Sequence, residues 1–179
     1  MVYLWLGLGL IAFVLLAWAF VYVNNNVLQV TRYEKRLGIE KDVKIVHLSD
    51  IHGKSFGRKN EKLLKKIVSE KPDVIAVTGD IIHKYRERDI GVALELVSSM
   101  CAIAPVLFVS GNHEMRNKGY RAFRKQLMEA GAVVMDDCNK EIAGLTVTGL
   151  NCASLKNGTA ERLKPDSAEK AVLLAHKPH

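Results

Sequence analysis

Three short apolar runs, each followed at once by polar residues, constrain the fold of this 179-residue chain most strongly. The runs end at Asp50-Ile51-His52, at Gly79-Asp80 and at Gly111-Asn112-His113-Glu114. About 30 residues separate successive clusters, which is the length of a strand–helix–strand unit. Short apolar runs of this kind are typical of buried parallel strands. Because ligands bind beyond the carboxyl ends of such strands, we expect the three clusters to meet at one edge of a sheet.

The rest of the sequence alternates strand-like and helix-like patterns and predicts an α/β fold with a partly parallel sheet. We expect three helices: Asn60 caps the first, Asp89 caps the second, and the third stops at Gly131. Residues 153–170 have weak periodicity and are expected to form a loop with at most a short helix. The predicted strands cover 43–48, 74–77, 106–109, 132–135, 141–150 and 171–175.

The N-terminal segment is apolar from Tyr3 to Val23, and residues 1–23 carry no charged side chain. A helix rises about 1.5 Å per residue, so this segment could cross a hydrocarbon core of roughly 30 Å. A cleaved signal peptide and a buried core helix are the alternatives. The length of the run and the absence of a preceding basic residue favour a retained anchor. We therefore expect a transmembrane anchor over 1–23, a linker over 24–42 and a folded domain over 43–179.

Basic residues after this segment indicate its orientation. No Lys or Arg precedes the span, and five follow it closely: Arg32, Lys35, Arg36, Lys41 and Lys44. The positive-inside rule then predicts a single-pass protein whose domain lies in the cytoplasm. The net charge of +7 suits anionic lipid headgroups or a phosphorylated substrate. Aromatic residues do not interleave with the basic ones, so nucleic-acid binding is not expected.

The residue types in the three clusters are those that bind metal ions. Carboxylate, imidazole and amide groups suit Mn, Fe or Zn, and no cysteine belongs to the clusters. Asp50 and His52 can act together because alternate side chains of an extended chain lie on one side. Gly79 and Gly111 allow sharp turns beside the ligands. The clusters therefore predict a metal site.

The motifs LSDIH, TGD and GNHE resemble the first three signature motifs of the calcineurin-like metallophosphoesterase superfamily, and the chain is more closely similar to its bacterial membrane-associated branch. The resemblance covers roughly residues 43–179. It implies a sandwich of two mixed β-sheets flanked by helices. It also implies two divalent metal ions, the first bound by Asp50 and His52, with Asp80 bridging both.

The same resemblance implies the remaining site residues. Asn112 would bind the second ion, and His113 would protonate the leaving group or steady the transition state. Ala175-His176-Lys177-Pro178 matches a later family motif, which makes His176 another ligand of the second ion. The family closes its site with a Gly-His-x-His motif, which this sequence lacks. We therefore expect a C-terminally truncated chain with an incomplete site and poor catalysis.

Other polar residues near these motifs have structural interpretations. His47 faces away from Asp50 in an extended strand and is expected to be a strand residue. His83 is interpreted as a surface histidine rather than a partner of the site. Glu114 is expected to orient its loop by hydrogen bonding rather than to bind metal. Asp136-Asp137 is expected to be a solvated turn.

The resemblance implies a phosphoesterase that is anchored at a membrane and uses manganese or a similar divalent ion. It would hydrolyse phosphomonoester, phosphodiester or pyrophosphate bonds. A lipid-linked substrate such as UDP-diacylglucosamine would suit an enzyme anchored at a membrane. One alternative is an inactive fragment or a non-catalytic membrane protein that retains the fold. A nuclease or nucleotide phosphodiesterase is the other alternative, and the expected membrane anchor argues against it.

Overall fold

The computed structural model of the chain describes residues 2–84, 86–154, 158–165 and 170–177. It contains two compact units, Met1–Lys35 and Arg36–His179, and each is described by itself.

The first unit consists largely of helix α1 (Val2–Asn26). Side chains are exposed throughout Tyr3–Asn26, and the most apolar 18 consecutive residues of this span have a mean hydropathy of 2.5. The helix runs past the expected start of the linker, through Asn24, Asn25 and Asn26. Each of these donates a side-chain amide hydrogen bond of 2.9–3.0 Å to the carbonyl four residues earlier. The helix is thus long and apolar enough to cross a membrane, a property that a signal sequence shares.

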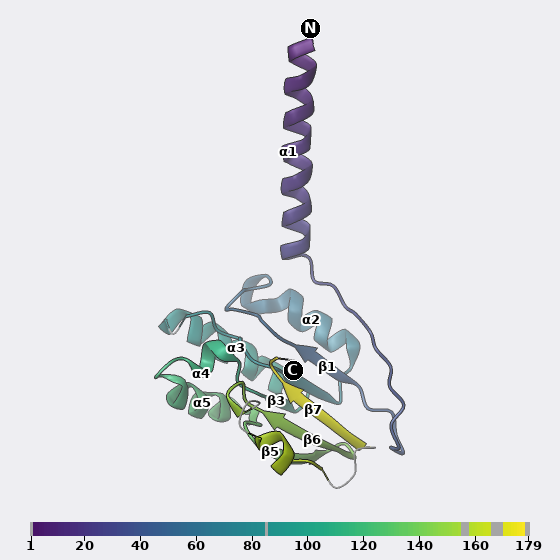
Figure 1. Ribbon diagram of the computed structural model, residues 1–179, viewed down its shortest axis with the longest axis vertical. Helices are drawn as coiled ribbons and strands as arrows, with labels where there is room; N and C mark the ends of the chain where they lie inside the picture. The colour runs from purple at the N-terminus through teal and green to yellow at the C-terminus, as the bar shows by residue number, and fades with distance from the viewer. Residues whose placement is uncertain (1, 85, 155–157, 166–169, 178–179) are drawn as a thin grey trace. The chain divides into compact units, whose positions relative to one another are not determined.

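The second unit contains a parallel sheet, sheet A, whose strands follow the order β1-β2-β3-β4. Two of these strands, β1 and β3, are labelled in Figure 1. Its strands are β1 (Ile45–Leu48), β2 (Val74–Val77), β3 (Val106–Phe108) and β4 (Val133–Val134). Parallel pairing aligns Leu48 with Val77, and Val77 with Phe108. Each strand lies within a run predicted as a strand. Because all four strands run in one direction, their carboxyl ends share one edge.

Helices connect the strands of sheet A. They are η1 (Arg58–Asn60), α2 (Glu61–Glu70), α3 (Glu87–Cys101), α4 (Asn112–Met115) and α5 (Tyr120–Glu129). Asn60 precedes α2, but its side chain makes no capping bond and instead accepts the Phe56 N–H at 2.9 Å. The expectation that Asp89 caps α3 is wrong. The helix begins at Glu87 after Arg86, so Asp89 lies in the first turn. There its negative charge interacts favourably with the positive end of the helix dipole and stabilises the helix.

The second sheet, sheet B, is mixed. Strand β5 (Cys138–Ile142) pairs antiparallel with β6 (Leu145–Leu150), and β6 pairs parallel with β7 (Ala171–Ala175). The single strand predicted over 141–150 is therefore wrong, because a hairpin turn interrupts it. The turn residues Ala143 and Gly144 have φ of 52° and 78°, as a two-residue hairpin turn of type I′ requires. The short helix α6 (Thr159–Arg162) precedes β7.

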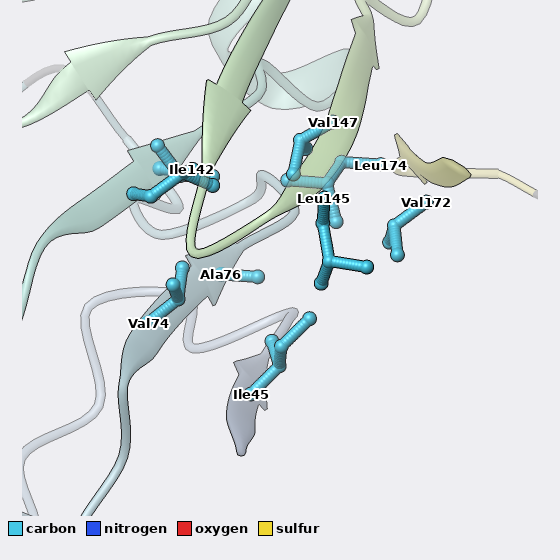
Figure 2. Close-up of a pocket in the computed structure, with 9 residues that line it drawn as sticks. Ile45, Val74, Ala76, Ile142, Leu145, Val147, Val172 and Leu174 are labelled. Carbon is cyan, nitrogen blue, oxygen red and sulfur yellow. The ribbon is translucent and has the colours of Figure 1, made fainter. Parts of the chain in front are cut away.

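The two sheets pack face to face through an apolar core. Val74 and Ala76 of β2 and Leu107 of β3 contact residues of β6 and β7, among them Val147 and Leu174. Figure 2 shows the small space between the sheets, which hydrocarbon side chains line on both sides. On the opposite face of sheet A, α3 contacts β3 and α5 contacts β4. The predicted α/β fold of two sheets flanked by helices is confirmed. Sheet B is mixed, as expected, whereas the described strands of sheet A are all parallel.

Candidate metal centre

The loops after β1 and β2 run side by side at the carboxyl edge of sheet A. The Asp50 N–H donates to the Gly79 carbonyl at 3.2 Å, and the His52 N–H donates to the Asp80 carbonyl at 2.9 Å. A further bond of 2.7 Å joins the Gly53 N–H to the Ile81 carbonyl. The two polar clusters thus extend the pairing of β1 with β2, and they meet as the sequence predicted.

Three residues of these loops have a left-handed backbone. Asp50, His52 and Asp80 have φ of 55°, 51° and 51°, values that residues other than glycine rarely adopt. Each such conformation costs on the order of 1–3 kcal/mol and persists only where the surroundings hold it. Here the backbone bonds between the loops hold it. Strain of this kind concentrates at functional sites.

Two glycines let the second and third loops approach closely. A Cβ atom on Gly79 would lie 2.2 Å from the backbone nitrogen of Gly111. A Cβ atom on Gly111 would lie 2.2 Å from Oδ1 of Asp80. Real Cβ contacts are never this short, so larger side chains at either position would push the loops apart. The expected sharp turn is found at Gly79, whose φ is 79°, whereas Gly111 has an extended backbone and is needed instead because the loops approach so closely.

Glu114 ties the same two loops together from inside. Its side chain is fully buried, and Oε2 accepts the N–H groups of Asp80 at 2.8 Å and Gly111 at 2.9 Å. Oε1 accepts the Ile82 N–H at 3.3 Å. Burial raises the pKa of Glu114, and the three backbone bonds counteract that rise. The prediction that Glu114 orients its loop by hydrogen bonding is confirmed.

Two carboxylates and one imidazole form the first candidate ligand group. Asp50, His52 and Asp80 each offer one ligand atom, and these three atoms lie within 4.8 Å of one another. Nε2 of His52 is 3.6 Å from Oδ1 of Asp50. The Ser49 hydroxyl donates to Oδ2 of Asp50 at 2.5 Å, which leaves Oδ1 on the side of His52.

His176 reaches this group from sheet B. Its Nε2 atom lies 3.3 Å from Oδ2 of Asp80, and its side chain is only 5% exposed. Its Nδ1 atom lies 2.8 Å from the Thr78 carbonyl, which can only accept a hydrogen bond. The proton of a neutral ring is therefore on Nδ1, and Nε2 keeps the lone pair that a metal ligand needs.

His113 contacts Asp80 twice. Its backbone N–H donates to Oδ1 at 2.9 Å, and its Nε2 atom is 3.9 Å from Oδ2. Its Nδ1 atom donates to the His83 carbonyl at 3.2 Å. Asn112 is the first residue of α4. Because the next residue, His113, donates its backbone N–H to the Asp80 carboxylate, the backbone of Asn112 lies close to that carboxylate. Asp50, His52, Asp80, His113 and His176 thus lie close together, and Asn112 begins the helix beside them.

The donor chemistry of this group fits a divalent cation. Carboxylates and imidazoles together suit Mn, Fe or Zn. Nδ1 of His52 is buried and has no hydrogen-bond partner within the described part of the chain. A coordinated cation would satisfy a nitrogen of this kind. The Asp80 carboxylate is 3% exposed and lies 3.3 Å from Nε2 of His176 and 3.9 Å from Nε2 of His113.

Sequence reasoning misjudged two features around the site. His83 is exposed, as expected, but one of its ring nitrogens lies within 4.8 Å of ring nitrogens of both His52 and His113. The solvated turn expected at Asp136-Asp137 is also wrong, because both side chains bind neighbouring loops. Asp136 follows β4 by two residues and comes directly after the predicted strand run 132–135, so its place at the same sheet edge was the available signal.

Asp136 fixes the start of the third loop. Its Oδ1 atom accepts the N–H of Ser110 at 2.8 Å and the Ser110 hydroxyl at 3.0 Å, and its Oδ2 atom accepts the Tyr120 hydroxyl. Burial and the Asp136 carboxylate raise the pKa of Tyr120, so the phenol stays a donor. His47 is the strand residue that was predicted, with Nε2 2.7 Å from Oγ1 of Thr78.

Comparisons with known proteins agree with this geometry. The calcineurin-like phosphoesterase family matches residues 43–178. The uncharacterized metallophosphoesterase Cj0846 of Campylobacter jejuni is 25% identical over 149 residues, which are 78% of this chain and 40% of that protein. The uncharacterized protein R555 of Acanthamoeba polyphaga mimivirus is 32% identical over 82 residues, which are 39% of this chain and 6% of that protein. The chain thus spans well under half the length of these relatives. With its fold and its cluster of carboxylates and imidazoles, the chain belongs to the calcineurin-like phosphoesterase family.

Proposed function

We propose that this protein is a metal-dependent hydrolase of phosphomonoester, phosphodiester or pyrophosphate bonds. The observation that carries the proposal is the convergence of Asp50, His52 and Asp80, with His176 and His113 both facing the Asp80 carboxylate. Family membership supports the same chemistry. Manganese is the first metal to test, followed by iron and zinc.

The proposal gives each ligand a role. Asp50 and His52 would hold one divalent ion, Asn112 and His176 a second, and Asp80 would be shared between them. Such a pair of ions, when bound, polarises phosphoryl oxygens and neutralises the charge that develops on them. The Thr78 carbonyl keeps His176 in the tautomer that binds metal. Glu114 keeps the backbone of Asp80 fixed while the carboxylate binds.

His113 is the proposed general acid. Its Nδ1 proton is held by the His83 carbonyl, so Nε2 is the atom that gains and loses the catalytic proton. A protonated Nε2 would donate its proton to the leaving oxygen as the bond to phosphorus breaks.

We also propose that residues 1–23 are a retained anchor, that 24–42 are a linker, and that the domain over 43–179 lies in the cytoplasm. The exposed apolar surface of α1 and the basic residues that follow it support this arrangement. An enzyme held at a membrane would suit a lipid-linked substrate such as UDP-diacylglucosamine. Carbonate-washed membranes should retain the protein with an intact N-terminus by mass spectrometry. Release of a soluble form that begins within α1 would refute the anchor.

The proposed activity is tested with the full chain purified in detergent. The chain is stripped of metal and then assayed with manganese, iron or zinc. The substrates are p-nitrophenyl phosphate, bis(p-nitrophenyl) phosphate and UDP-diacylglucosamine. Metal-dependent hydrolysis of at least one substrate supports the proposal. Absence of hydrolysis with every metal, in protein that binds those metals, would favour a non-catalytic relative that retains the fold.

A further inference from the structure

A cluster of three imidazoles lies beside the proposed metal pair. His52, His83 and His113 each offer one ring nitrogen, and these three nitrogens lie within 4.8 Å of one another. Ring centroids are 5.6 Å apart for His52 and His83, 5.0 Å for His52 and His113, and 5.3 Å for His83 and His113. His83 has no part in the proposed phosphoesterase mechanism apart from its backbone carbonyl. The side chain of His83 therefore needs a separate explanation.

We propose that His52, His83 and His113 form a zinc site that inhibits the enzyme when it is occupied. Three imidazoles and one open position are an arrangement that zinc adopts in proteins, with Zn–N bonds of about 2.0–2.1 Å. The three nitrogens must approach one another to form those bonds. Rotation of exposed or partly exposed side chains is enough for this, because His83 is exposed and His52 and His113 are 35% and 34% exposed.

The nitrogen atoms are arranged so that such a site can form. Nε2 of His52 faces Asp50, whereas Nδ1 is buried and has no partner within the described residues. Nδ1 of His52 is thus the atom for which zinc in this site and the proposed first ion would compete. In His113, the bond from Nδ1 to the His83 carbonyl leaves the lone pair on Nε2. The carboxylates of Asp50 and Asp80, 3.6 Å and 3.9 Å from these rings, favour a cation nearby.

Zinc in this site would use two residues of the proposed catalytic machinery. It would occupy His113, the proposed acid, and compete for His52, a proposed ligand of the first ion. This consequence for activity depends on the proposed function, whereas zinc binding by the three imidazoles does not. Binding and inhibition are therefore measured separately.

Binding is measured in a full-length Asp80→Asn background, which weakens the paired-metal site. Asparagine retains an oxygen that can accept the His113 N–H, so the third loop keeps its anchor. Zinc affinity is determined by competition with a chromophoric chelator. Adding His83→Asn should weaken zinc binding at least about 10-fold, because loss of a ligand costs no less than loss of a group that orients a ligand. The matched control His47→Asn should leave the affinity unchanged.

A second measurement uses the wild-type chain. Zinc should protect His83 from ethoxycarbonylation, located by mass spectrometry, whereas magnesium should not. In an active preparation, excess zinc should inhibit manganese-dependent hydrolysis, and His83→Asn should relieve that inhibition. Equal zinc affinity with and without His83, or equal modification of His83 with and without zinc, would overturn the zinc site. Loss of all hydrolysis alongside normal zinc binding would instead count against the proposed function.

Discussion

Nε2 of His176 lies 3.3 Å from Oδ2 of Asp80, although Asp80 follows a strand of sheet A and His176 follows a strand of sheet B. The other nitrogen of His176 bonds the Thr78 carbonyl, also at the end of sheet A. One buried side chain therefore joins the two sheets at the site. The position of the ligands depends on how the sheets pack, and the packing depends in part on the ligands.

His176→Ala should affect both stability and metal binding. The substitution removes a buried bond to Thr78 and leaves the Asp80 carboxylate without one of its imidazoles. The free energy of unfolding should fall by about 1–3 kcal/mol, the usual cost of a lost buried hydrogen-bond partner. Urea unfolding and manganese titration of the same preparations measure the two effects. Lys177→Ala, at the exposed neighbouring position, should change neither. Wild-type behaviour of His176→Ala would contradict the contact.

Gly111→Ala should separate the second and third loops. The new methyl group would lie 2.2 Å from Oδ1 and 2.6 Å from the backbone nitrogen of Asp80. The loops must move, and overpacking of this kind costs about 1–3 kcal/mol. Gly91→Ala is the control, because a methyl group at that helical position meets nothing within 4 Å. It should be neutral or stabilising by up to about 1 kcal/mol. Equal thermal stabilities for the two variants would show that the loops do not need the glycine.

His47 should make stability depend on pH. Burial lowers the pKa of His47 from its ordinary value of 6.5, although the Asp50 carboxylate partly raises it. Below about pH 6.5 the unfolded chain takes up a proton that the folded chain does not. The free energy of unfolding should therefore fall as pH drops from about 7.5 to 5.5. Urea unfolding across that range should show a shallower fall for His47→Asn. Identical slopes would mean that partial burial of the His47 ring does not lower its pKa.

The sequence predicted the strands of sheet A because buried parallel strands are short apolar runs bounded by polar residues. Val74–Val77 is buried at every position and was predicted to the residue. The hairpin of sheet B was missed because its turn contains Ala143, an alanine in a left-handed conformation that no turn pattern signals. The predicted cap at Asn60 was wrong because its side-chain oxygen accepts the N–H of Phe56, which precedes the helix, rather than an N–H of the helix itself. The sequence around Asn60 does not show which of these N–H groups it binds.

The ligands of the candidate site could be predicted because each follows a strand, so topology alone brings them to one edge. His83 and Asp136 could not be assigned in the same way. His83 contacts His52 and His113 through a loop whose course depends on the tie between Glu114 and Ile82. Asp136 accepts hydrogen bonds from Ser110 and Tyr120, which are distant from it in sequence and approach it only after the sheet has formed.

His113→Ala should lower turnover far more than metal content. General acid catalysis is worth about 10²–10⁴ in rate, and the proposed ligands of both ions would remain in place. Turnover of bis(p-nitrophenyl) phosphate and the metal content of the same preparation give the two values. His47→Asn, which removes an imidazole outside the proposed ligand set, is the matched control. Parallel losses of metal and turnover would make His113 a ligand rather than an acid.

The most direct test of the metal centre is manganese-dependent hydrolysis of bis(p-nitrophenyl) phosphate by wild-type, Asp80→Asn and Asp42→Asn chains. Asp80 is the carboxylate that His113 and His176 both face, whereas Asp42 is an exposed residue outside the site. The account predicts slow but measurable manganese-dependent turnover in the wild type and in Asp42→Asn, and a loss of about 10²-fold or more in Asp80→Asn, comparable to the loss of a key electrostatic group. Turnover in Asp80→Asn within a few-fold of the wild type at the same manganese concentration would contradict the account.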